Sequence, residues 1–150
     1  MGVDVLTQIE IARPRAAVAA FAADPSNATT WYRNIDAVTW ETSPPLAVGS
    51  RVRFRARFLG RTLEYTYEVL EYEPSERLVQ GTTTGPFAME TTYTWSDASP
   101  GTLMTLRNRG EPAGVMRMLG GLLEPAMRRA NRADLSRLKA LLESDPDATG

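Results

Sequence analysis

The chain has 150 residues, enough for one domain with its own core, and 43% hydrophobic with 23% charged residues is ordinary for a globular protein. Its 17 basic and 18 acidic residues give a net charge of −1, which argues against a domain-wide basic surface for nucleic acid. The absence of cysteine and histidine excludes disulfides, thiol nucleophiles, Ser-His-Asp triads and most zinc sites, so we expect no metal ion and no cofactor.

The N-terminal segment MGVDVLTQIEIARP has no basic region followed by an apolar run, so we expect no signal peptide. No apolar stretch approaches the roughly 18 residues that a membrane span needs. These two features predict a cytoplasmic protein without a membrane span.

The first part of the chain predicts one strand and two short helices. Residues 3–11 alternate loosely between apolar and polar side chains, as a strand does. Pro14 then opens an alanine-rich helix at residues 15–23, which ends at an Asp-Pro pair. A second short helix is expected to run towards Trp31.

From residue 36 the hydrophobic period changes to two, which predicts a series of strands separated by turn residues. We expect these strands at residues 38–40, 51–58, 61–74, 77–84, 87–95 and 102–109. Pro112 marks the change to a long helix over 113–143, kinked in its first third by Gly120-Gly121 and Pro125. Residues 144–150, SDPDATG, are expected to form a disordered tail, which leaves 1–143 as a single domain.

The long helix is expected to bury two successive apolar faces, the second rotated from the first. The expected first face consists of Val115, Leu119, Leu122, Ala126, Ala130 and Ala133. The expected second face consists of Leu135, Leu138, Leu141 and Leu142.

The segment RVRFRARF, residues 51–58, has two interpretations. Arginines interleaved with aromatic residues occur on nucleic-acid platforms, where bases stack and phosphates pair. They also occur on a half-buried strand whose solvent face is arginine. If Leu59-Gly60 is a two-residue turn, Phe54 faces Tyr65 on one side while Arg55 faces Glu64 on the other. One register then satisfies both faces, so we expect a solvated arginine face and no nucleic-acid partner.

The opposite face of the predicted sheet mixes aromatic residues and methionines with amides and hydroxyls. A turn at Gly85-Pro86 places Gln80 opposite Thr91 and Leu78 opposite Tyr93 on this face. Apolar walls with a few polar groups are typical of a small-molecule cavity, whereas a packed core prefers Val, Ile and Leu. A filled core whose polar groups bond each other or buried water is the alternative. Glu90 and the other strand glutamates fall on the outer face, which counts against a strand carboxylate as a catalytic base.

The order of elements is that of the α+β helix-grip fold. Three stretches, IEIARPRAAVAAFAADPSNATTWY, VGSRVRFRARFLGRTLEYTYEVLEYEPSERLVQGTTTGPF and LSRLKALLE, resemble the START-like superfamily SRPBCC in its polyketide cyclase/dehydrase branch. The resemblance spans residues 3–143. It implies a curved antiparallel sheet of about seven strands that wraps around the C-terminal helix, with a deep apolar cavity between them. Because members include aromatases, cyclases, lipid carriers and hormone receptors, it assigns no catalytic residue.

The candidate ligand-binding residues combine the inner-face pattern with what the resemblance implies. They are Trp31, Phe54, Tyr65, Tyr67, Gln80, Met89, Thr91, Tyr93, Asn108, Met118 and Leu122. The resemblance implies that Trp31 lies near the cavity mouth and that Met118 and Leu122 face the cavity from the helix. Each of these three residues could instead belong to an ordinary core.

Two functions of different classes fit these expectations. The first is binding of a hydrophobic small molecule, aromatic, polyketide-like or lipid, in the internal cavity. The second is a cyclase or dehydratase that works in the same cavity without histidine, cysteine or metal, with a tyrosine or carboxylate moving the proton. A third hypothesis is a surface protein that binds nucleic acid or acidic partners through the arginines of residues 51–57. The ligand, the reaction and the oligomeric state stay open, a homodimer included.

Overall fold

The computed structural model describes residues 2–58, 60–84, 88–111 and 121–144. The elements are β1 (Val3–Ile11), α1 (Arg15–Ala23), the short 3-10 helix η1 (Pro25–Asn27), α2 (Ala28–Trp31), β2 (Ile35–Trp40), β3 (Arg51–Phe58), β4 (Arg61–Glu73), β5 (Arg77–Thr84), β6 (Ala88–Asp97), β7 (Thr102–Glu111) and α3 (Leu123–Ser144). The expected order of strands and helices is therefore confirmed. The expected start of the long helix and most of the expected tail lie outside the described residues, and Ser144, expected in the tail, is the last residue of α3.

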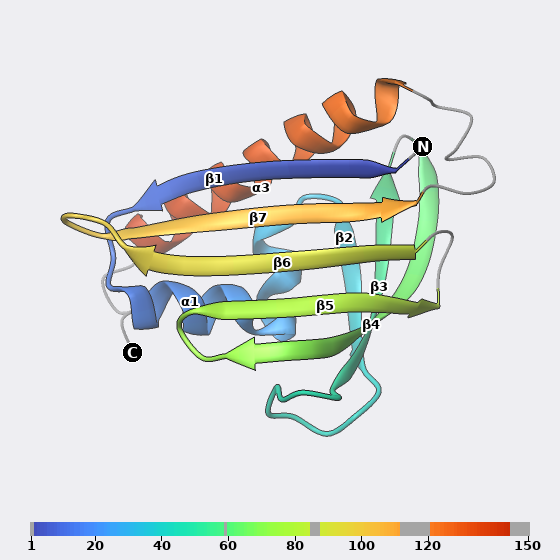
Figure 1. Ribbon diagram of the computed structural model, residues 1–150, viewed down its shortest axis with the longest axis horizontal. Coiled ribbons are helices and arrows are strands. Elements are labelled where there is room, and N and C mark those ends of the chain that lie inside the picture. Colours follow the sequence, from blue (N-terminus) through green and yellow to red (C-terminus); the bar gives the residue numbers. More distant parts are fainter. Residues whose placement is uncertain (1, 59, 85–87, 112–120, 145–150) are drawn as a thin grey trace.

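All seven strands form one antiparallel sheet in the order β1-β7-β6-β5-β4-β3-β2. In Figure 1, β1, β7 and β6 run across the view while β2 and β3 run nearly at right angles to them, so the sheet is strongly curved. The pairing of β4 with β5 is irregular at two places, Thr66/Tyr67 and Val69/Glu71. Such bulges bend a strand and increase its twist, which explains the curvature.

The β3–β4 hairpin has the expected register. Phe54 pairs with Tyr65, their rings stack with centroids 5.6 Å apart, and Arg55 pairs with Glu64 on the other face. Phe58 pairs with Arg61 across the turn, where Gly60 adopts a φ of 78° that favours glycine. Every arginine of β3 is exposed, which confirms the solvated outer face.

The outer arginines form ion pairs with carboxylates of neighbouring strands. Arg51 Nε lies 3.2 Å from Glu68 Oε1, as the register predicts. Arg55 Nε donates instead to Asp36 Oδ1 of β2 at 2.8 Å, because β2 flanks β3 on the side away from β4. The β5–β6 pairing also follows the prediction, with Gln80 opposite Thr91 and Leu78 opposite Tyr93, although the turn at Gly85-Pro86 lies outside the described residues.

The helix α3 packs beside β1 and crosses the concave side of the sheet (Figure 1). Its buried side chains recur every three or four residues: Leu123, Met127, Asn131, Asp134, Leu135, Leu138 and Leu142. The expected apolar face is wrong at Leu122, which is 72% exposed, at Ala133 and at Leu141. The expectation followed apolar residues only, whereas two positions of the buried face are polar. Pro125 lies in the first turn of α3, where a missing backbone N–H removes no intrahelical bond.

The C-terminal half of α3 covers a filled core. Leu135, Leu138 and Leu142 pack with Val18 and Ala22 of α1 and with buried side chains of β5, β6 and β7. These interactions fix α1 and α3 on the concave side of the sheet, which is the arrangement of the helix-grip fold. No helix in the described ranges is long and apolar enough to cross a membrane.

Candidate ligand-binding cavity

A cavity of about 170 Å³ lies between the curved sheet and the N-terminal half of α3. An engineered cavity of about 150 Å³ in another protein holds benzene, so this space accommodates a small aromatic molecule. Strand residues that line it include Phe54, Ala56, Phe58, Leu63, Tyr65, Tyr67, Gln80, Thr82, Met89, Thr91, Tyr93 and Asn108. The helices and the segment before β2 add Ala22, Ala23, Asp24, Pro25, Ala28, Trp31, Tyr32, Asn34, Ile35, Met127, Ala130, Asn131 and Asp134.

The structure brings nine of the eleven residues proposed from the sequence to the wall of this cavity. Leu122 is not among them, because it precedes α3 and points to solvent while its neighbour Leu123 is buried. Met118 lies outside the described residues. Trp31 lines the cavity but is fully buried and packs in the core, so the expectation that it lies near the mouth is wrong.

Aromatic side chains supply most of the apolar wall. On β3 and β4, the ring centroids of Phe54, Tyr65 and Tyr67 lie 5.2 to 5.8 Å apart. On the opposite side, the Trp31 and Tyr32 rings lie 4.0 Å apart, and Trp31 also contacts Tyr93 at 6.0 Å. Such rings bury large areas against a ligand and offer faces for offset stacking.

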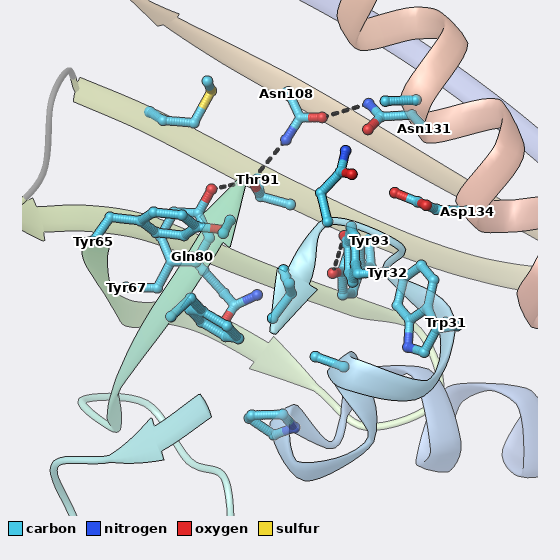
Figure 2. Close-up of a pocket in the computed structure, with 18 of the residues that line it drawn as sticks. Trp31, Tyr32, Tyr65, Tyr67, Gln80, Thr91, Tyr93, Asn108, Asn131 and Asp134 are labelled. Atoms are coloured by element: carbon cyan, nitrogen blue, oxygen red, sulfur yellow. Dashed lines mark hydrogen bonds between the residues drawn. The ribbon is translucent and has the colours of Figure 1, made fainter. Parts of the chain in front are cut away.

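A chain of hydrogen bonds crosses the cavity wall from the sheet to α3 (Figure 2). The Tyr67 hydroxyl and Thr91 Oγ1 lie 2.6 Å apart, and Asn108 Nδ2 donates to Thr91 Oγ1 at 2.8 Å. Asn131 Nδ2 of α3 in turn donates to Asn108 Oδ1 at 2.6 Å. Burial raises the pKa of Tyr67 to about 12, with the bond to Thr91 opposing the rise. The hydrogen-bond chain therefore consists of neutral groups at neutral pH and joins the sheet to the helix.

The hydroxyls of Tyr32 and Tyr93 form a second hydrogen-bonded pair in the wall (Figure 2). Burial, followed by the effect of Tyr93, raises the pKa of Tyr32 well above its ordinary value. Burial also raises the pKa of Tyr93. Both phenols therefore stay protonated at neutral pH, and one of their two protons is left to donate to a third group.

Asp134 is the one acidic side chain that α3 contributes to the described cavity wall. It is only 4% exposed, and its Oδ1 accepts a hydrogen bond of 3.0 Å from the backbone N–H of Arg33. Burial raises the pKa of Asp134 to about 6, against the Arg33 N–H bond and the positive charges of Arg137 and Arg33, which lower it. The carboxyl group is therefore largely ionised at neutral pH and takes up a proton in mildly acidic solution.

Some polar groups of the wall have no hydrogen-bond partner among the described residues. Gln80 is only 5% exposed, yet its side-chain amide makes no hydrogen bond to any described residue. The Tyr65 hydroxyl also makes no hydrogen bond to a described residue, and burial raises its pKa well above its ordinary value. Because buried polar groups are normally paired, these two are suited to a bound molecule that carries its own polar atoms.

Sequence reasoning missed Tyr32, Asn131 and Asp134. Tyr32 follows a short helix, and its direction depends on how the chain turns into β2. Asn131 and Asp134 lie three residues apart on a helix, a spacing that puts them on one face. That face also carries Met127, Leu135 and Leu138. The alignment of Asn131 and Asp134 with these apolar residues was the pattern that could have indicated their burial.

Among the described residues, no group of three or more acidic side chains is placed to hold a metal ion.

The sequence model of the family described as polyketide cyclase/dehydrase and lipid transport matches residues 3–143. The chain belongs to this family. The resemblance to the START-like superfamily SRPBCC is thereby confirmed, and membership implies a cavity for a hydrophobic ligand. The family includes both enzymes and carriers in its description, so the role of each wall residue stays a prediction.

Solved structures with the same fold come from several bacteria. A protein from Thermus thermophilus has a TM-score of 0.82 and 19% identity, covering 95% of this chain and 100% of its own. The Zhui aromatase/cyclase from a Streptomyces species has a TM-score of 0.80 and 16% identity, and the match covers 95% of this chain and 94% of the Zhui chain. A START superfamily protein from Mycobacterium smegmatis has a TM-score of 0.81 and 14% identity, and the match covers 94% of this chain and 97% of the other. A comparison with curated proteins found no match. At these identities the likeness concerns the fold alone.

Proposed function

We propose that this protein binds a small hydrophobic molecule with an aromatic ring in the cavity between the sheet and α3. The observation that carries the proposal is the cavity of about 170 Å³ with aromatic side chains on two sides. Family membership supports it, because the family's ligands are hydrophobic. A filled core, the alternative left open by the sequence, would leave no such space.

The affinity for a single-ring ligand is expected to be modest. Burial of apolar area contributes about 25 cal/mol per Å², but association costs several kcal/mol of lost freedom. A ligand of this size should therefore bind with a Kd between about 10 µM and 1 mM.

A titration with phenethyl alcohol, followed by tryptophan fluorescence and calorimetry, tests the proposal. Trp31 lines the cavity and should report binding. Ala130→Leu on α3 adds side-chain volume to the cavity wall and should abolish binding, whereas Ala140→Leu, exposed on the same helix, should leave it unchanged. Absence of binding by the wild-type protein, or equal binding by the two variants, would contradict the proposal.

A second candidate function is a cyclase or dehydratase reaction in the same cavity, favoured by the buried carboxyl of Asp134. A carboxylate whose pKa burial raises to about 6 can accept a proton from the carbon between two carbonyl groups. That carbon would then attack a third carbonyl, whose oxygen would take the proton back from Asp134, and the resulting hydroxyl would leave as water together with a second hydrogen of the attacking carbon. Mass spectrometry of an acyclic triketone incubated with the protein tests this candidate: ring closure with loss of water must exceed that with Asp134→Asn.

A further inference from the structure

The charge of the described cavity wall has one sign. Of the described lining residues, Asp24 and Asp134 are acidic and none is basic. Asp24 is exposed and uses its Oδ1 to accept the N–H of Ser26 at the start of η1. Asp134 is 4% exposed, and its negative charge also contributes to the raised pKa values of Tyr32, Tyr65 and Tyr93. One buried carboxylate therefore dominates the electrostatic field inside the cavity.

This carboxylate lacks an ion-pair partner in the described part of the chain. Arg33 contributes a backbone N–H to Oδ1, and no described group donates to Oδ2. The side chains of Arg33 and Arg137 are exposed and act on Asp134 only over a distance. A buried charge normally needs a paired and hydrogen-bonded counter-charge, because its desolvation is costly. A cationic ligand would supply that counter-charge from inside the cavity.

Aromatic rings lie beside the carboxylate. Figure 2 shows Asp134, Trp31 and the Tyr32–Tyr93 pair in the same part of the view, and the charge of Asp134 acts on both phenols. The ring centroids of Trp31 and Tyr32 are 4.0 Å apart and those of Trp31 and Tyr93 are 6.0 Å apart. A cation placed within about 6 Å of such rings is attracted by their negative faces. An aromatic cluster with a carboxylate is the chemistry that recognises an ammonium group.

We propose that the cavity binds an arylalkylamine, whose ammonium group pairs with Asp134 and whose ring packs against Phe54 and Tyr65. The inference rests on the proposed function, since it names the chemical class of the ligand bound at that site. An ammonium group has three N–H donors. Asp134 Oδ2, the oxygens of the Tyr32–Tyr93 pair and Asn131 Oδ1 are acceptors that the described wall offers to such a group.

The polar groups of the sheet complete this arrangement. Gln80 projects from β5, on the sheet side of the cavity, and its amide has no described partner. A hydroxyl or carbonyl substituent on the ligand's ring would pair with this amide. A ligand carboxylate, by contrast, would meet the charge of Asp134 without a basic residue to offset it in the described wall. The cavity therefore discriminates against fatty acids and other carboxylate ligands.

Three probes of similar size and different charge test the proposal by calorimetry at neutral pH: phenethylamine, phenethyl alcohol and hydrocinnamate. Wild-type protein should bind the amine about ten-fold or more tightly than the alcohol, as expected for a hydrogen bond between charged groups, and the carboxylate most weakly. In Asp134→Asn, the amine should lose this advantage in affinity. The affinity for the alcohol should change by no more than about two-fold, and the affinity for hydrocinnamate should rise. The control Asp97→Asn, 80% exposed and outside the cavity, should behave as wild type.

A pH series on the wild-type protein gives a test that needs no variant. The amine's advantage over the alcohol should shrink as the pH falls through about 6, where Asp134 takes up its proton. The wall tyrosines on which the charge of Asp134 acts do not titrate in this range, because burial raises their pKa values and they stay neutral.

The outcomes separate the two proposals. If the alcohol binds but the amine binds no more tightly, or if the amine's advantage survives Asp134→Asn or acidification, the amine proposal is wrong and the cavity proposal stands. If none of the three probes binds wild-type protein, both are wrong.

Discussion

Asn108→Leu is the substitution that probes the polar wall most directly. Asn108 is the central member of the hydrogen-bond chain, since it donates to Thr91 and accepts from Asn131. Leucine has the same branched shape, although its methyl groups make it larger, and it removes both bonds. Thr91 keeps its bond to Tyr67, whereas the Asn131 amide, in a side chain only 8% exposed, loses its partner.

The expected cost is about 1–3 kcal/mol of unfolding free energy, the usual penalty for a buried donor left without an acceptor. For a domain of this size, that cost corresponds to a fall in Tm of about 2–10 °C. The sequence analysis placed Asn108 only among the candidate ligand-binding residues. The contact with Asn131 changes that expectation, because the same side chain also joins β7 to α3.

Urea unfolding followed by circular dichroism measures the effect, with Arg107→Leu as the matched control. Arg107 is the neighbouring residue of β7 on the outer face, and its pair with Asp4 at 2.7 Å is about half exposed. Such surface pairs are worth at most about 1 kcal/mol. If Asn108→Leu destabilises the protein no more than Arg107→Leu does, the hydrogen-bond chain does not hold the wall together.

The double variant Asn108→Leu/Asn131→Leu tests the mechanism. Once Asn108 is leucine, replacing Asn131 removes the unpaired amide and restores an apolar contact. The two effects should therefore fall short of additivity by about 1 kcal/mol or more. Additive effects would show that the cost arises elsewhere, for example from strain on β7.

Three further predictions concern charge, packing and the outer face. The folded-state pKa of Asp134 is about 6, whereas its ordinary value is 3.8. The stability that its protonated form contributes is therefore lost as the pH rises from about 4 through 6. Urea unfolding over this range should show that Asp134→Asn becomes more stable relative to the wild-type protein. Tyr67→Ala should cost a few kcal/mol, on the order expected for truncating a large core side chain, and should enlarge the cavity enough for two-ring ligands to gain affinity in calorimetry. Single-stranded DNA should show no submicromolar, salt-dependent binding in fluorescence anisotropy, because carboxylates such as Asp36 and Glu68 pair with the β3 arginines.

The register of the β3–β4 hairpin could be predicted from the sequence because two independent patterns agreed there. In the β3–β4 hairpin, only one register places Phe54 opposite Tyr65 and Arg55 opposite Glu64, and the structure has that register. A slip of one residue would move every apolar side chain to the solvent face. The partner of Arg55 could not be predicted, because Asp36 belongs to β2, whose pairing with β3 is irregular near Ile35.

The helical half of the cavity could not be predicted in the same way. On α3 the sequence pattern favoured Leu122 and Ala133, whereas the buried stripe passes through Asn131 and Asp134. Polar residues on a helix usually face water. A prediction based on apolar residues alone therefore misplaces the buried face of a helix when two residues of that face are polar. Asn108 and the Arg33 backbone N–H lie opposite them and reduce the cost of their burial, and these contacts cannot be read from the sequence.

Core and cavity residues follow one another along α3. Leu135, Leu138 and Leu142 fill the core, whereas Ala130, Asn131 and Asp134, earlier on the helix, line the cavity. Smaller and more polar side chains there cost packing and desolvation energy that an apolar helix would not, and such costs are typical of a functional site. The solved structures that share this fold are at most 19% identical among those compared above, so they do not determine the ligand. The ligand class must therefore follow from this chain's own wall, in which a buried carboxylate has no basic partner among the described lining residues.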